Sequence, residues 1–106
     1  MPSPRLSQLL EFHREAPHDP FLIYAIATEY RSEQPQEALA YYERLLTEHP
    51  HYVATYYHIA QLYIELDQPE RAETAFRKGI TEAAAQNEAL ALRELQNAYN
   101  EFLFEE

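Results

Sequence analysis

The chain has 106 residues, a formal net charge of -10 and no cysteine. This length suits a single domain that folds without covalent cross-links. The lack of thiols excludes disulfides, thiolate metal sites and a cysteine nucleophile. Because Lys78 is the single lysine and no basic stripe is present, nucleic acids and anionic membrane surfaces are poor partners for such an acidic chain.

No run of residues approaches the ~20 apolar positions that a membrane-spanning helix needs, and the N-terminal segment lacks the charged-then-apolar pattern of a secretory signal. We therefore predict a cytoplasmic protein. The acidic, lysine-poor composition also suits a salt-rich environment, where surplus carboxylates keep a protein hydrated. Ordinary acidic proteins share this composition, so both explanations stay open.

The composition predicts an all-α fold, because a single glycine and seven prolines stand among abundant alanine, leucine, glutamate and glutamine. Proline pairs such as Ser3-Pro4 and Asp19-Pro20 are typical helix starts. The break at Gln86-Asn87 carries no proline, so one alternative is that the last two helices run nearly together. In chain order, the predicted helices lie between Pro4 and Pro17, Pro20 and Gln34, Gln36 and His49, Val53 and Asp67, Pro69 and Gln86, and Leu90 and Phe102.

The even spacing of these helices indicates an internal repeat. A shift of 34 residues superimposes Gln34-Pro35 on Gln68-Pro69. Further upstream the shift becomes 33, as expected for one residue fewer in a turn. The matched pairs are Ala38 with Ala72, Tyr42 with Phe76, Leu46 with Ile80, Thr47 with Thr81, Glu48 with Glu82, Tyr24 with Tyr57, Ile26 with Ile59, Ala27 with Ala60 and Tyr30 with Tyr63.

This period and residue pattern resemble the tetratricopeptide repeat. The second copy matches through Tyr56, Ile59, Ala60, Tyr63, Ala72, Phe76 and Gly79, with Ala84 in place of the usual closing proline. The first copy offers Ile23, Ile26, Ala27, Tyr30, Ala38, Tyr42 and Pro50, with Leu45 where a small residue is expected. The resemblance implies a short right-handed helical-repeat solenoid of antiparallel helix pairs, about six helices in all. Within the single domain 1–106, it places an N-terminal packing helix at 1–17, repeats at 18–51 and 52–85, and a C-terminal capping helix at 86–106.

Small residues at the repeated positions let helix axes approach, while aromatic side chains fill the remaining volume. Gly79 is the clearest case. Glycine inside a helix costs about 0.5 to 1 kcal/mol relative to alanine, so its presence predicts a crossing that a methyl group would obstruct.

The resemblance also implies a binding site, because the first helix of each such repeat lines a concave groove. Tyrosine rings, amides and a few charges suit an extended peptide or a partner helix. The alternative is that Tyr24 and Tyr57 only cover the edge of the core and that a partner binds the convex face. The predicted groove residues are Tyr24, Thr28, Arg31, Tyr57, His58, Gln61, Glu65, Arg93, Glu94 and Asn97.

Some relatives clamp the terminal carboxylates of chaperones with basic and amide residues, but Tyr24, Thr28 and His58 stand at those positions here. Arg31 or Arg93 could still meet a carboxylate. The histidines show no metal-binding spacing and are expected to be solvated, with His58 in the groove or on the surface. No metal, cofactor or catalytic residue is predicted, because phosphate loops and nucleophile motifs are absent.

The predicted function is therefore a protein-interaction or scaffold module that binds a protein or peptide, with no enzymatic activity. One alternative is a homodimer formed through Phe102-Leu103-Phe104, because two repeats are fewer than the ~3 that usually make a stable array. A more remote alternative is a small-molecule site or an enzyme accessory domain, which a deep pocket with convergent polar groups would favour.

Overall fold

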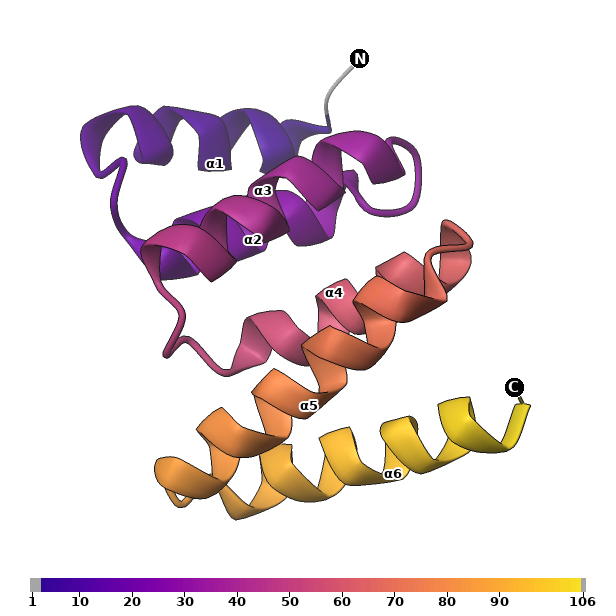
Figure 1. The fold of residues 1–106 in the computed structure, drawn as a ribbon. Helices are drawn as coiled ribbons and strands as arrows, with labels where there is room; N and C mark the ends of the chain where they lie inside the picture. Colours follow the sequence, from indigo (N-terminus) through magenta and orange to yellow (C-terminus); the bar gives the residue numbers. More distant parts are fainter. Residues whose placement is uncertain (1–2, 106) are drawn as a thin grey trace. The chain divides into compact units, whose positions relative to one another are not determined.

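A computed structural model describes residues 3–105 of the chain, and positions 1, 2 and 106 of the predicted terminal segments lie outside the described residues. This part of the chain forms helices and no strand, so the all-α prediction is confirmed (Figure 1). The helices are α1 (Pro4–Glu15), α2 (Pro20–Tyr30), α3 (Pro35–Glu48), α4 (Ala54–Glu65), α5 (Pro69–Ala85) and α6 (Ala89–Glu105).

Proline marks the start of four helices. Pro4, Pro20, Pro35 and Pro69 each occupy the first helical position, where the missing N–H costs nothing and the fixed φ angle favours the helix. The side chain of Ser3 accepts a hydrogen bond from the Leu6 amide at 3.0 Å, which caps α1. The starts at Pro4 and Pro20 agree with the sequence prediction, whereas α3 begins at Pro35, one residue before the predicted start at Gln36.

Two helices end in a residue with a left-handed backbone conformation, and the next amide donates a hydrogen bond to the carbonyl five residues earlier. Asp67 has a φ angle of 59° after α4, and the Gln68 amide donates to Tyr63 O at 2.8 Å. Asn87 has a φ angle of 58° after α5, and the Glu88 amide donates to the backbone carbonyl five residues earlier at 2.9 Å. Both are Schellman endings, and the one at Asn87 ends α5 without a following proline. The idea that the fifth and sixth helices run nearly together is therefore wrong.

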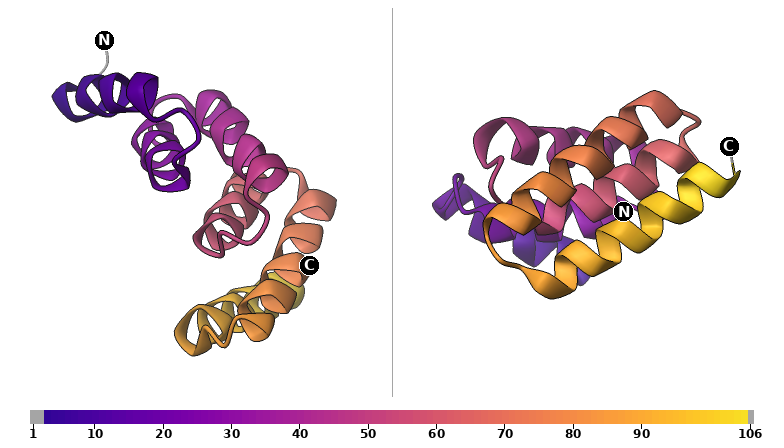
Figure 2. Two further views of the ribbon diagram at one scale, coloured as in Figure 1. Left: turned by 90° about the vertical axis from the view of Figure 1, so that its left-hand side faces the viewer. Right: turned by 60° about the horizontal axis from the view of Figure 1, so that its bottom comes forward.

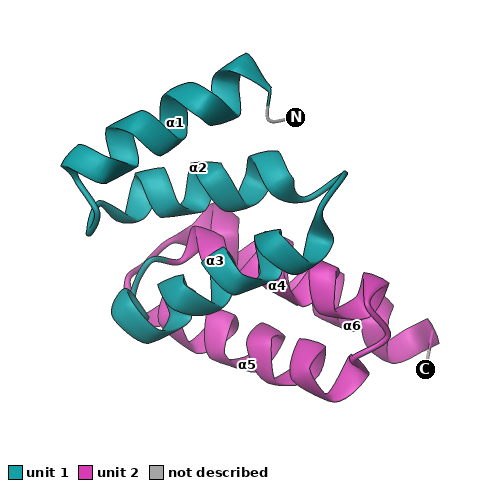
Figure 3. Cartoon of the chain, turned by 90° about the horizontal axis from the view of Figure 1, so that it is seen from above, with its two compact units in different colours: residues 1–52 teal, residues 53–106 magenta. Residues whose placement is uncertain are grey.

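The chain divides into two compact units, Met1–Tyr52 and Val53–Glu106 (Figure 3). In unit 1, α2 packs against both α1 and α3. Leu6 and Leu9 of α1 meet Ala25 and Ile26 of α2 in an apolar core, and partly buried leucine and tyrosine side chains cover its edges. The polar faces of these helices stay exposed. The burial of Leu6 and Leu9 against α2 therefore holds α1 in place.

In unit 2, α5 packs against α4 and α6, and α4 also contacts α6. Figure 2 shows α5 and α6 joined at their turn as a hairpin. Gly79 lies where α5 crosses α4, and a Cβ atom there would come within 2.5 Å of Tyr56 Cβ and 3.2 Å of Leu95 Cδ1. The predicted close crossing at Gly79 is confirmed.

The other small residues of the repeat pattern are also buried. Ala27 and Ala38 in unit 1, and Ala60 and Ala72 in unit 2, have no exposed surface. Since a larger side chain at any of them would have to displace packed neighbours, the small residues set how closely the helices pack within each unit.

Candidate functional site

One side of α4 remains outside the core of unit 2. The buried side of α4 carries Thr55, Tyr56, Ile59, Ala60, Leu62 and Tyr63, whereas residues on the opposite side of the helix are exposed or only half-buried. Tyr57 is 38% exposed, and its ring lies edge-on to the half-buried ring of His58, 5.6 Å between centroids. The outward stripe of α4 includes Tyr57, His58, Gln61 and Glu65.

Helix α6 also has one buried side, which carries Leu95, Ala98 and Phe102. Arg93, Glu94 and Asn97 are exposed on the opposite side. Because α4 and α6 contact each other, seven of the ten predicted site residues lie on two neighbouring helices of unit 2. Residues 53–106 hold four basic and ten acidic side chains, so the field around these helices is negative.

The other three predicted residues belong to unit 1: Tyr24 and Thr28 lie on α2, and Arg31 caps its C-terminal end. Thr28 Oγ1 donates to the Tyr24 carbonyl at 3.0 Å, which leaves it to accept from the hydroxyl of the buried Tyr42, also at 3.0 Å. Burial raises the pKa of Tyr42, and hydrogen bonds with Thr28 and Arg31 offset part of that rise. Thr28 of α2 and the C-cap residue Arg31 therefore stabilise a buried hydroxyl on α3, a role that the sequence pattern did not reveal.

Tyr24 lies over the edge of the core of unit 1. Its ring stands edge-on to Tyr42, with 6.4 Å between centroids, and is tilted against Tyr52 at 5.9 Å. The three rings form an aromatic cluster, and the half-buried Tyr24 ring packs against both of the others. Tyr24 thus contributes to packing in unit 1, whereas Tyr57 in unit 2 is more exposed.

The prediction of solvated histidines is wrong for two of the five. His13 on α1 is half-buried with its Nδ1 atom inaccessible, and the Nε2 atom of His49 is inaccessible as well. His18 is largely exposed. Within residues 3–105, no three histidine or acidic side chains come together in an arrangement that could hold a metal ion.

Arg44 on α3 is a polar residue that the sequence analysis missed. It donates hydrogen bonds to His13 and to the carbonyl of Pro17, which lie 31 and 27 positions away along the chain. No local pattern singles out one arginine among seven when its partners are so distant. The repeat period carries no signal for it either, because the equivalent position 78 holds a lysine.

None of the helices within residues 3–105 combines the length and apolar character needed to cross a lipid bilayer.

The tetratricopeptide repeat family model matches residues 29–96. A solution NMR structure of a tetratricopeptide repeat domain protein from Salinibacter ruber is 38% identical, with a TM-score of 0.77 over 81% of this chain and 88% of that chain. A crystal structure of a tetratricopeptide repeat domain protein from the same organism is 37% identical, with a TM-score of 0.79 over 83% of this chain and 99% of that chain. Among curated proteins, none matches the chain.

Proposed function

Because the chain belongs to the tetratricopeptide repeat family, whose members generally act as protein-interaction modules, we propose that it binds an extended segment or a helix of a partner protein and catalyses no reaction. The observation that carries this proposal is the pair of outward stripes on two contacting helices of unit 2. We call this surface the α4–α6 face. It consists of Tyr57, His58, Gln61, Glu65, Arg93, Glu94 and Asn97.

The chemistry of the α4–α6 face suits a peptide better than a small molecule. Tyr57 offers a large ring that loses little entropy on binding, and amides such as Gln61 and Asn97 can bond to a peptide backbone. Glu65 and Glu94 outnumber the single arginine of the face, in a unit that is itself acidic. A partner segment carrying lysine or arginine beside an apolar residue fits these charges.

In unit 1, we extend the proposal to two half-buried side chains, Tyr24 on α2 and Arg31 at the C-cap of that helix. The hydroxyl of Thr28 already bonds to the Tyr24 carbonyl and the Tyr42 hydroxyl within unit 1. We therefore expect Thr28 to contact a partner by packing and not by a hydrogen bond. We do not assign chaperone-tail binding to these residues, because a tyrosine and a threonine stand where the relatives use basic and amide side chains.

A peptide library displayed on phage and selected against the intact chain provides the probe for this function. For a selected peptide, we expect the double substitution of Tyr57→Ala and His58→Ala to raise Kd by about tenfold or more, because the aromatic contact area is lost. Increasing the salt concentration from about 50 to about 500 mM should also weaken binding, since the proposed attraction is partly ionic. Fluorescence anisotropy measures both effects.

The matched control is Thr74→Ala with Lys78→Ala, which changes two exposed residues of α5 in the same unit. Its Kd should stay within about twofold of the parent value. Equal losses from the two double variants, or a selection that enriches no peptide, would contradict the proposal.

A second candidate function is self-association through the end of α6. Phe102 is buried against the ring of Phe76, 5.7 Å between centroids, so it is not part of a free apolar tail. Leu103 is 48% exposed and Phe104 is 93% exposed, and these two residues are the specific observation that favours a homodimer.

Sedimentation velocity tests the homodimer. If it forms through this end of α6, the sedimentation coefficient should rise with concentration, and Phe104→Glu should abolish the rise. Phe102→Glu is unsuitable because it would place a charge in the core. A monomer at high concentration, unchanged by Phe104→Glu, would remove the basis for this candidate.

The small-molecule alternative finds little support. A pocket beside α1 and α2 in unit 1 has a volume of about 150 Å³ and is lined by Leu6, Tyr30 and polar side chains, two of them the carboxylates of Glu29 and Glu33. Ligand sites are commonly about 300 Å³ or larger, so this pocket is small even for a compact metabolite.

A further inference from the structure

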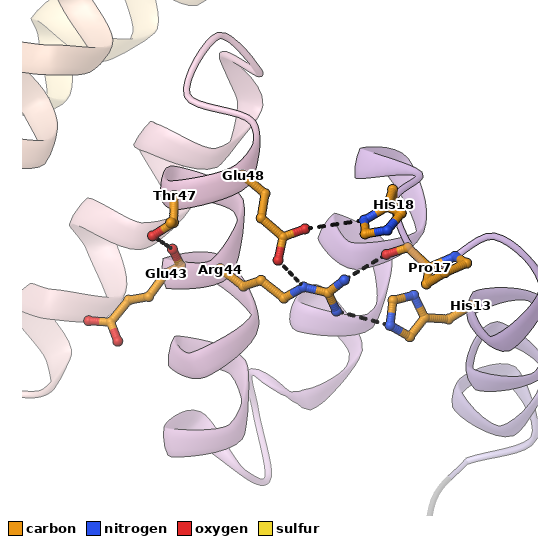
Figure 4. Close-up of polar contacts among 7 residues, drawn as sticks. All are labelled: His13, Pro17, His18, Glu43, Arg44, Thr47 and Glu48. Atoms are coloured by element: carbon orange, nitrogen blue, oxygen red, sulfur yellow. Dashed lines mark hydrogen bonds and ion pairs between the residues drawn. The ribbon is translucent and has the colours of Figure 1, made fainter.

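Arg44 connects three segments of unit 1 through one guanidinium group (Figure 4). Its Nε atom donates to Glu48 Oε2 at 2.7 Å on the same helix. Its Nη2 atom donates to the carbonyl of Pro17 at 2.6 Å, in the turn between α1 and α2. Its Nη1 atom lies 3.0 Å from Nε2 of His13, near the C-terminal end of α1. The guanidinium therefore joins α3 to α1 and to the turn that follows it.

This geometry dictates the protonation state of His13. An arginine has donors and no acceptor, so Nε2 of His13 has to accept the hydrogen bond, and the imidazole is neutral with its proton on Nδ1. The Nδ1 atom is buried and has no hydrogen-bond partner. A second proton on this ring would place an N–H group against the guanidinium, with no acceptor between two cations.

The charges around His13 act in both directions. From α3, Arg44 opposes protonation, the carboxylate of Glu48 favours it, and Tyr41 presents its ring at 6.3 Å. From the turn before α2, His18 opposes it. Burial is the largest influence and Arg44 the next, so together they lower the pKa of His13 below its ordinary value of 6.5.

We propose that His13 and Arg44 form a proton-sensitive tie, which holds the C-terminal end of α1 to α3 at neutral pH and releases it when the imidazole is protonated. On protonation, Arg44 keeps its bonds to Glu48 and Pro17, so the turn stays attached to α3. His18 lies 3.8 Å from Glu48 Oε1, a further contact between this turn and α3. Release is therefore confined to the last turn of α1.

The pH dependence follows from the direction of the shift. The folded state binds the proton of His13 less tightly than the unfolded state does, so the tie contributes its full stability above pH 6.5 and loses it as the pH falls through the lower folded pKa. Opening starts at the C-terminal end of α1, because Leu6 and Leu9 anchor the rest of the helix in the core of unit 1. Acid thus exposes the end of α1 before it unfolds the unit.

The imidazole nitrogen shifts of the intact chain test the proposal directly. We expect a neutral His13 with its proton on Nδ1, titrating below 6.5. Free histidine prefers the opposite tautomer, so a His13 that carries its proton on Nε2, or that titrates at or above its ordinary pKa, overturns the proposal.

Amide hydrogen exchange supplies the structural readout. Between about pH 7.5 and about pH 5, and after correction for intrinsic rates, exchange in residues 12–16 should accelerate about threefold to tenfold, while α5 stays unchanged. In His13→Gln, the side-chain oxygen can still accept from Arg44 but does not titrate, so the acceleration should disappear. It should persist in His18→Gln. Persistence in His13→Gln, or loss in His18→Gln alone, contradicts the assignment to His13.

Discussion

Replacing Gly79 by alanine is expected to destabilise the protein by about 2 to 3 kcal/mol, although alanine favours a helix by about 0.5 to 1 kcal/mol. The added Cβ atom would lie 2.5 Å from Tyr56 Cβ, an atom that is fixed by its backbone and cannot rotate away. Relief therefore requires α4 and α5 to separate, which loosens packing along their whole contact. Chemical denaturation of the variant and the parent measures the difference.

Lys78→Ala is the control for this experiment, because Lys78 is the exposed neighbour of Gly79 on the same helix. It should change the free energy of unfolding by no more than about 0.5 kcal/mol. An unchanged or increased stability in Gly79→Ala would show that α4 and α5 do not cross as closely as described.

Truncating Phe76 to alanine should have a larger effect, about 3 to 5 kcal/mol. Phe76 has no exposed surface, and its ring contacts Tyr99 and Phe102 of α6 at centroid distances of 5.5 and 5.7 Å. The lost ring would leave a cavity between α5 and α6 that the two remaining aromatic side chains cannot fill. Because α6 carries three residues of the α4–α6 face, binding should weaken with stability. Thermal and denaturant unfolding, followed by circular dichroism, would detect the change.

Phe104→Ala offers the same chemical truncation at a position that is 93% exposed. It should alter the free energy of unfolding by about 0.5 kcal/mol or less. Similar losses from Phe76→Ala and Phe104→Ala would contradict the packing of α6 against α5.

The fold was largely predictable because most of the signals that mark helix starts are local in the sequence. Four prolines mark helix starts by their own geometry, and the repeat of small and aromatic residues identifies the family. The ending at Asn87 was harder to predict, since asparagine tolerates a left-handed conformation without requiring it, and the Schellman motif also depends on the surrounding backbone. Local signals therefore gave the helices, and one break depended on backbone context.

The candidate site was predictable only in part. The resemblance to the repeat family named Tyr57 and Gln61 of α4 as candidate residues, and both lie outside the core. It did not show that Thr28 bonds to the hydroxyl of Tyr42, or that Arg44 reaches His13 and Pro17. Those contacts depend on distances between separate helices, and side-chain spacing along one helix carries no information about them.

The α4–α6 face is tested most directly by NMR, with the isotope-labelled chain titrated with a phage-selected peptide. The largest amide shifts should fall on Tyr57, His58, Gln61 and Glu65 of α4 and on Arg93, Glu94 and Asn97 of α6. Shifts concentrated instead on the exposed α5 positions Glu70, Thr74 and Thr81 would contradict the proposed binding surface, even if the peptide bound tightly.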